Sequence, residues 1–149
     1  MVLRSFRLEN HRSFQGEAEL LLLPSYATQR SAVPVAAVYG ANAAGKSNLL
    51  DGLRFMSRAV RDSYRRWEPE GGVPRRPYRL DPASLARPST FVVDLVLDGT
   101  RYVYGFTVDD DHVLQEWLYG YPHVKRRVIF EREGSATEFG STVVESRAS

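Results

Sequence analysis

One short stretch of the sequence has residue types and a spacing suited to phosphate chemistry. It reads Gly40, Ala41, Asn42, Ala43, Ala44, Gly45, Lys46 and Ser47. This order matches the pattern glycine, four residues, glycine, lysine, then serine or threonine. Phosphate oxygens need several converging backbone N–H groups, and small residues let the backbone approach closely enough to donate them. We therefore predict a phosphate-binding loop over residues 40–47, with Gly40 and Gly45 in conformations that other residues resist.

The two last residues of this loop have distinct predicted roles. Lys46 is expected to neutralise the β- and γ-phosphates of a nucleotide, and it is the candidate catalytic residue. Ser47 is expected to offer its hydroxyl to Mg²⁺, as the predicted metal ligand. A helix that begins near Gly45 would add the positive end of its dipole and its unpaired N–H groups. The loop therefore predicts a nucleoside triphosphate, ATP or GTP, as the ligand and Mg²⁺ as the cofactor.

The residues on either side of the loop predict the elements that position it. Residues 33–39 form a short apolar run with β-branched side chains, which predicts a strand buried on both faces, as in a parallel sheet. From residue 47 to about residue 64, apolar side chains recur at steps of four, three and four residues, which predicts an amphipathic helix. These side chains are Leu49, Leu53, Met56 and Val60.

The remainder of the chain predicts mostly strands. Two short strands are expected at residues 2–8 and 17–23, joined by a turn-rich connector, and residues 68–88 are expected to form a loop. The last third alternates apolar and polar residues between turn signals, which predicts an antiparallel meander. Its strands are expected at residues 91–97, 102–108, 113–121 and 126–130, with turns at Asp98-Gly99 and at residues 109–111.

The predicted fold class is therefore α/β. We expect a P-loop NTPase lobe, with a mixed sheet around the P-loop helix and an antiparallel β meander in the C-terminal third. The predicted organisation is a nucleotide-binding core at residues 1–66, an irregular linker at 67–90, and an antiparallel part of the same lobe at 91–149.

Composition excludes several other classes. The chain of 149 residues has no cysteine, so disulfides and thiolate metal sites are excluded. Its three histidines, His11, His112 and His123, are too scattered to predict a metal site by spacing. No apolar stretch approaches the length of a membrane span, so we expect no membrane partner and a cytoplasmic location.

Further motifs resemble a known group of ATPases. Asn42 within the loop and the sequence Ser-Asn-Leu-Leu-Asp at residues 47–51 resemble the SMC, RecF and OLD branch of ABC-type ATPases. Residues 8–14 resemble an element of the same branch, with His11 where an aromatic residue is usual. Residues 88–91, 102–106 and 116–119 resemble the bacterial AAA15 family, whose members are often linked to defence.

This resemblance implies additional site residues and a missing part. It implies that Arg12 lies close to the bound phosphates, and that Asn42 and Asn48 line or brace the loop. It also implies a second acidic strand end and a signature segment that normally lie much later in the chain. Asp98 superficially fits such an acid, but its position before Gly99 predicts a turn residue. We therefore expect an ATP-binding N-terminal lobe whose hydrolysis needs a missing C-terminal lobe or a partner such as a second copy.

Three alternatives stay open on the sequence. The first is a non-catalytic truncated fragment or a nucleotide-sensing module. The second is a small self-contained P-loop kinase or GTPase, although no asparagine-lysine-x-aspartate guanine reader occurs in the sequence. The third is contact with nucleic acid, for which the physical hint is an arginine stripe at helical spacing, better explained as a solvated helix face. The stripe consists of Arg54, Arg58, Arg61 and Arg65.

Overall fold

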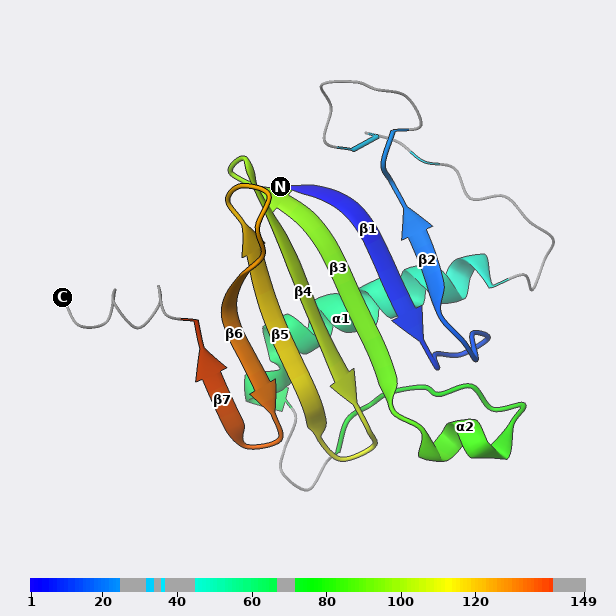
Figure 1. Cartoon of the computed structure of the whole chain (residues 1–149). Helices are drawn as coiled ribbons and strands as arrows, with labels where there is room; N and C mark the ends of the chain where they lie inside the picture. Colours follow the sequence, from blue (N-terminus) through cyan, green and yellow to red (C-terminus); the bar gives the residue numbers. More distant parts are fainter. Residues whose placement is uncertain (25–31, 34–35, 37–44, 67–71, 141–149) are drawn as a thin grey trace.

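The computed structural model describes residues 1–24, 32–33, 36, 45–66 and 72–140, with only the backbone described for residues 62–66. Within this part, the chain forms one sheet with a long helix, α1, across one of its faces (Figure 1). A short helix, α2, lies beside the end of the sheet where β1 ends and β3 begins (Figure 1). Neither described helix has the length and apolar character needed to cross a lipid bilayer.

Seven strands form the sheet, in the order β2-β1-β3-β4-β5-β6-β7. Their bounds are β1 Val2–Glu9, β2 Ala18–Leu21, β3 Ser89–Leu97, β4 Thr100–Val108, β5 Val113–Tyr121, β6 Arg127–Glu133 and β7 Ala136–Phe139. Every neighbouring pair is antiparallel. From β3 to β7 each strand pairs with the next one in the chain, so the predicted antiparallel meander is confirmed.

The first strand joins the N-terminal hairpin to the meander. β1 lies between β2 and β3, with Leu8 opposite Phe91 and Phe6 opposite Val93. Directly opposed residues share one face of a sheet, so these side chains gather on the same face. Phe6, Leu8 and Phe91 are almost fully buried there. The pairing brings the end of β1 next to the start of β3, where the connecting turn described below is held.

Helix α1 (Lys46–Arg66) covers this apolar face and confirms the predicted amphipathic helix, although Val60 of the predicted apolar face is 57% exposed. Leu49 and Met56 are buried in one core with the apolar residues of β1, β3 and β4. At Gly52 an added Cβ would lie 2.5 Å from Leu8 Cδ2, so a glycine at this point lets the helix approach β1 closely. The approach matters for function, because it fixes the N-terminal end of α1 against the residues that follow β1.

Some expected elements differ from the structure. The predicted buried strand at residues 33–39 falls largely outside the described residues, and Val33 and Ala36 belong to no strand. All strand pairs in the described part are antiparallel, so the mixed sheet remains a prediction. Helix α2 (Pro82–Ala86) lies within the stretch predicted as irregular, because Asp81 caps it by accepting a hydrogen bond from the Ala83 N–H at 3.1 Å.

The connecting turn, residues 10–14, is anchored through the buried side chain of Asn10. Its amide nitrogen donates to the carbonyls of Ser84, Arg87 and Pro88 at 2.8, 2.8 and 3.2 Å. Its side-chain oxygen accepts the N–H of Tyr78 at 3.1 Å. Asn10 also has a φ of +52°, a region that asparagine tolerates better than most residues. One side chain therefore joins the end of β1 to the segment between α1 and β3.

Arg75 anchors that segment from its other side. Its side chain is 1% exposed. It donates to Asp110 Oδ1 at 2.7 Å, to the Arg87 and Leu85 carbonyls at 2.7 and 2.8 Å, and to Ser89 Oγ at 3.3 Å. A buried guanidinium with this many acceptors is well satisfied. Residues 72–88 are thus fixed at Asn10 and at the β4–β5 turn, although outside α2 they have no regular structure.

Substitution of Asn10 with alanine is predicted to lower the free energy of unfolding by about 2–4 kcal/mol, because buried backbone groups lose their partners. Urea denaturation followed by circular dichroism measures this change. The matched control is Gln15→Ala, which removes an exposed hydrogen bond to Asp81 in the same region and should cost below about 0.5 kcal/mol. Equal losses for the two variants would contradict the anchoring role of Asn10.

Candidate functional site

Gly45, immediately before α1, has a backbone conformation that fits the phosphate-loop pattern. Gly45 has a φ of +88°, and the Leu49 N–H donates to its carbonyl at 3.0 Å. An added Cβ on Gly45 would lie 2.9 Å from both Phe14 Cζ and Ser13 Oγ. Conformation and space both favour glycine at this position, as the pattern predicted. The preceding loop residues Gly40, Ala41, Asn42, Ala43 and Ala44 lie outside the described residues.

The first turn of α1 presents groups suited to an anion. It contains no acidic side chain. Lys46 is the first residue of the helix, and Ser47 is exposed beside it. The Asn48 amide donates to Ser13 Oγ at 2.9 Å, so this residue links the helix to the connecting turn. The partial positive charge of the helix end and the lysine charge therefore act together without an opposing carboxylate in that turn.

Arg12 forms a two-pronged ion pair with Asp51 of α1. Its Nε donates to Oδ2 at 2.5 Å, and its Nη2 donates to Oδ1 at 2.9 Å. These hydrogen bonds are the main cause that lowers the pKa of Asp51 from its ordinary value of 3.8, so the carboxylate is ionised at neutral pH. Asp51 lies about one helical turn beyond Ser47. The ion pair therefore holds Arg12 beside the first turns of α1.

His11 binds the same carboxylate from the interior. It is 1% exposed, and its Nε2 lies 3.0 Å from Asp51 Oδ2. The ring packs edge-on against Phe91 at a centroid distance of 5.3 Å. Burial lowers the pKa of His11 from 6.5 despite the neighbouring carboxylate, so the neutral ring donates through Nε2–H. Its Nδ1 has no hydrogen-bond partner among the described residues.

An open cleft of about 680 Å³ begins beside these groups. We call it the arginine cleft; it is lined by Arg12, Ser13, Asn48, Arg76, Pro77, Tyr78, Arg79 and Leu80. The Arg12 N–H donates to the Arg76 carbonyl at 2.7 Å, which aligns the two walls. Arg76 and Arg79 are exposed and have no carboxylate partner in the described part of the chain. The cleft therefore has an excess of positive charge next to the α1 N-terminus.

The structure brings together every predicted site residue that it describes. Arg12, Gly45, Lys46, Ser47 and Asn48 lie around the start of α1. Several other residues of the same region had no predicted site role, although two of them lie in the segments 8–14 and 47–51 that resemble ABC-type ATPases. These are His11 and Asp51, which hold Arg12, and Arg76, Tyr78 and Arg79 of the cleft wall. The sequence feature that could have indicated the cleft wall is the high density of arginines at residues 75–79.

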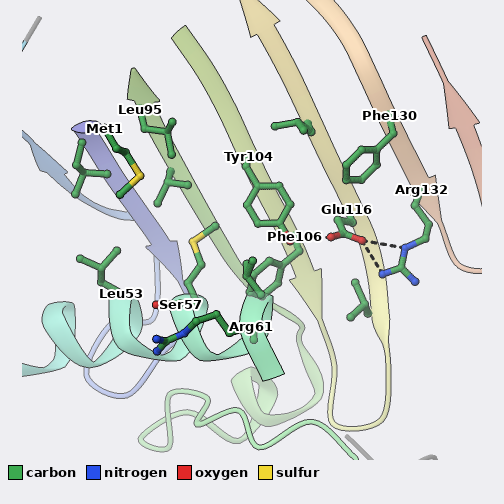
Figure 2. A pocket seen from close by; sticks show the side chains of 17 residues that line it. Met1, Leu53, Ser57, Arg61, Leu95, Tyr104, Phe106, Glu116, Phe130 and Arg132 are labelled. Carbon is green, nitrogen blue, oxygen red and sulfur yellow. Dashed lines mark hydrogen bonds and ion pairs between the residues drawn. The ribbon is translucent and has the colours of Figure 1, made fainter. Parts of the chain in front are cut away.

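A second hollow, of about 790 Å³, lies on the sheet face beside α1 (Figure 2). Its lining is largely apolar, with Leu53 of α1 opposite strand residues such as Leu95 and Phe130. Among its polar groups, Arg132 binds Glu116 at 2.8 Å and the Tyr104 hydroxyl donates to Glu116 at 2.7 Å, while Ser57 and Arg61 of α1 also line the groove. This groove is larger than the arginine cleft, but its lining is mainly apolar and includes the carboxylate of Glu116, so it suits a phosphate ligand less well than the arginine cleft does.

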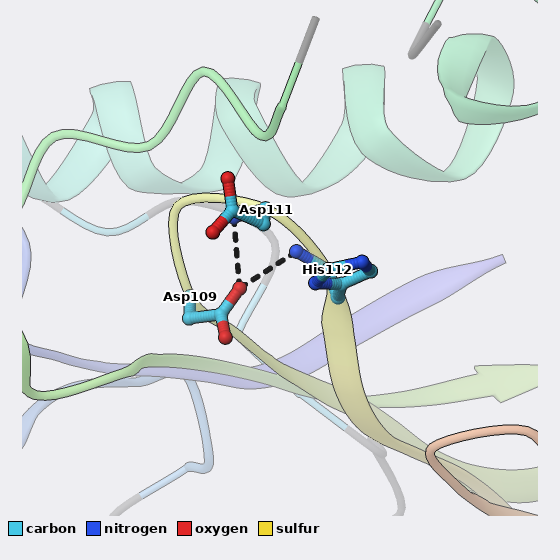
Figure 3. A group of neighbouring side chains, drawn as sticks. All are labelled: Asp109, Asp111 and His112. Carbon is cyan, nitrogen blue, oxygen red and sulfur yellow. Dashed lines mark hydrogen bonds between the residues drawn. The ribbon is translucent and has the colours of Figure 1, made fainter. Parts of the chain in front are cut away.

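Two acidic positions noted in the sequence are turn residues. Asp98 has a φ of +49° in the β3–β4 turn, as predicted. Asp109 Oδ1 accepts the N–H groups of Asp111 and His112 at 2.8 and 2.6 Å (Figure 3). Asp109, Asp111 and His112 are also close enough to one another to share a metal ion. The hydrogen bonds of the turn nevertheless account for Asp109, and two of the three side chains are exposed.

Comparison with known families identifies the class that this site defines. The sequence pattern of residues 40–47, with its lysine and serine in the first turn of α1, is typical of a phosphate-binding loop protein. The family model described as "AAA domain, putative AbiEii toxin, Type IV TA system" matches residues 35–143. The chain belongs to this AAA domain family. The match supports a P-loop ATPase-like domain that binds nucleotide. Comparison with curated proteins yields no match.

The buried neutral His11 predicts a pH dependence of stability. Its pKa is lower in the folded protein than the ordinary value of 6.5, so the unfolded chain binds the proton more readily. The free energy of unfolding should therefore fall as the pH drops through 6.5, by at most about 1.4 kcal/mol per pH unit from this residue. His11→Phe keeps the aromatic packing and should remove this component of the slope.

Urea denaturation of both proteins at pH 7.5, 6.5 and 5.5 tests the prediction. His112 and His123 are present in both proteins, so the difference between the two slopes isolates His11. Parallel slopes for wild type and variant would show that His11 does not resist protonation in the folded state.

Proposed function

We propose that the chain binds Mg-ATP, with the phosphates at the loop of residues 40–47 and the nucleoside in the arginine cleft. The main observation in favour of this proposal is that the start of α1 and the arginine cleft adjoin each other. Ser13 contacts both the Gly45 position and Asn48, so the cleft opens directly beside the helix N-terminus. A cleft of about 680 Å³ lies within the usual size range of small-molecule sites.

The residues at the start of α1 fit a magnesium nucleotide. Ser47 is exposed on the first turn and would hold Mg²⁺ through its hydroxyl, while Lys46 would neutralise phosphate charge. When bound, the metal supplies neutralisation of the charge that develops on the phosphates. The family match is consistent with the use of ATP and Mg²⁺. The choice of adenine over guanine rests on the resemblance to ABC-type ATPases.

We further propose that the chain is the N-terminal lobe of an ATPase of the AAA15, OLD and RecF type. In this account residues 1–66 form the nucleotide-binding core and residues 91–149 form an antiparallel part of the same lobe, linked by residues 67–90. Catalysis of phosphoryl transfer depends on positioned charges from several elements. Hydrolysis would therefore require a further lobe or a second copy to supply the acidic strand end and the signature segment.

An alternative proposal is a nucleotide-sensing module without hydrolysis. Such a module would use the same nucleotide site. ATP hydrolysis by the chain together with its further lobe or second copy would support the first proposal over this one. A small self-contained kinase or GTPase is disfavoured, because such proteins place helices between parallel strands. The described strands are antiparallel and follow one another without intervening helices from β3 to β7.

Isothermal titration of the purified chain with Mg-ATP tests binding, with circular dichroism to confirm folding. Wild type should bind saturably, and Lys46→Ala should weaken binding by at least about tenfold, because a charged contact to phosphate is lost. The matched control is Lys125→Ala, which removes the other lysine of the chain, an exposed residue in the β5–β6 turn. Failure of the folded wild type to bind would contradict the proposed function.

Substitutions in the wall of the arginine cleft should also weaken the binding of Mg-ATP, independently of Lys46. The double variant Arg76→Gln, Arg79→Gln should raise the Kd for Mg-ATP by about three- to tenfold, because two unpaired cations leave the cleft wall. Arg54→Gln, Arg58→Gln is the charge-matched control, since both arginines are exposed on α1 and do not line the cleft. Titration calorimetry at constant salt measures both. Equal weakening in the two double variants would indicate a general charge effect and would exclude the cleft as the nucleoside site.

A further inference from the structure

We infer that Asp51 is a positioning residue of the proposed nucleotide site, whose carboxylate orients the Arg12 guanidinium on the side of the arginine cleft nearest the α1 N-terminus, where the phosphates are proposed to bind. The inference rests on the proposed function, because it concerns the same site. Asp51 is not itself expected to contact the nucleotide. Its role is to fix the direction of a neighbouring cation that lines the cleft together with Ser13 and Asn48.

The hydrogen bonds of the ion pair determine which edge of Arg12 remains available. Asp51 engages the Nε and Nη2 edge of the guanidinium, at 2.5 and 2.9 Å. Such a two-pronged contact fixes the plane of the guanidinium as well as its position. The Nη1 edge is not used in this contact and stays available to a second acceptor. Asp51 thus converts a long, flexible side chain into a donor with one orientation.

The backbone of Arg12 is held independently of this side-chain contact. Its φ is +51°, and its N–H donates to the Arg76 carbonyl at 2.7 Å. The connecting turn is closed by reciprocal hydrogen bonds between His11 and Phe14, both of 2.9 Å. The remaining freedom of Arg12 is therefore in its side chain, and among the described residues Asp51 is the carboxylate that restrains it.

His11 supports Asp51 in this role. The buried ring donates to Oδ2, the same oxygen that accepts the Arg12 Nε–H. Because the ring is packed against Phe91 and Phe55, it fixes the carboxylate from the interior side. A neutral histidine adds a hydrogen bond without adding charge. The carboxylate therefore faces one cation, and its orientation is set by two donors from adjacent residues.

Positioning and simple electrostatics predict opposite effects for removal of the Asp51 charge. Asp51→Asn removes a negative charge near the proposed phosphate site, which by Coulomb attraction alone should tighten the binding of an anionic nucleotide. The same variant frees the guanidinium of Arg12, which should weaken binding if its orientation matters. The sign of the change in Kd distinguishes the two. Positioning predicts that the Kd for Mg-ATP rises by about tenfold, the size of one well-placed charged hydrogen bond.

Titration calorimetry of Mg-ATP with wild type, Asp51→Asn, Arg12→Gln and the double variant tests the inference. Asp51→Asn should raise the Kd in the presence of Arg12 and have little effect in the Arg12→Gln background, because the second residue acts through the first. AMP serves as a second ligand, whose Kd should change less, since it lacks the β- and γ-phosphates. Asp51→Glu should partly restore Mg-ATP binding, which a purely structural defect at this position would not explain.

Asp94→Asn is the matched control. Asp94 is likewise bound in a fork by Arg101, at 2.8–3.1 Å, but it lies on β3 and does not line the arginine cleft. It should leave both Kd values unchanged. A Kd for Mg-ATP that is unchanged or lower in folded Asp51→Asn would overturn the inference alone, since wild type would still bind. If Asp51→Asn does not fold, a Kd for Mg-ATP in folded Arg12→Gln equal to that of wild type would overturn it, because Arg12 would then make no contribution for Asp51 to direct. Absence of binding by folded wild type would overturn the proposed function and this inference together.

Discussion

The contact between the connecting turn and the first turns of α1 determines the geometry of the candidate site. On the turn, His11 and Arg12 bind Asp51 and Ser13 binds Asn48, so side-chain contacts from three residues hold the turn to the helix. Gly45 permits this approach, because any side chain there would meet Phe14 and Ser13. Without this contact, the arginines of the cleft would not stand beside the helix N-terminus.

The sheet and the apolar core supply the rigid frame for that contact. Buried Phe6, Leu8 and Phe91 fix β1 and β3 under α1, and Gly52 lets the helix lie close to β1. The turn and the cleft wall are held differently, by buried polar groups. Asn10 and Arg75 bind backbone carbonyls of residues 84–88, where every side chain except that of Ser84 is exposed and none of the exposed ones adds to the apolar core. Such groups are costly to bury unless they are satisfied, which makes their arrangement specific.

Local periodicity was sufficient to predict α1 and the strands of the meander. The apolar face of α1 and the alternating strands after residue 90 have strong, short-range patterns, and Asp98-Gly99 has a turn signal of its own. β7 was missed because its four residues are exposed and do not alternate, and α2 was obscured by neighbouring prolines. The pattern of residues 40–47 also predicted the conformation of Gly45.

The remaining features depend on contacts between residues that are far apart in the sequence. A single sequence has no periodic pattern that would reveal such contacts. Asp51 is 39 residues from Arg12, and Ser84 is 74 residues from Asn10. The arginine cleft arises only because Asn10 draws Tyr78 toward the turn and Arg12 pairs with the Arg76 carbonyl. The resemblance to ABC-type ATPases pointed to Arg12, but it did not indicate which residue would orient it.

The most direct test of this account is a crystal structure of the chain with Mg²⁺ and a non-hydrolysable ATP analogue. The account predicts the triphosphate at the N-terminus of α1, with Lys46 and Ser47 in contact with it. It also predicts the nucleoside between the Arg12 and Arg76 walls of the arginine cleft. A nucleotide bound in the apolar groove beside α1, or bound at α1 with its nucleoside directed away from the arginine cleft, would contradict it.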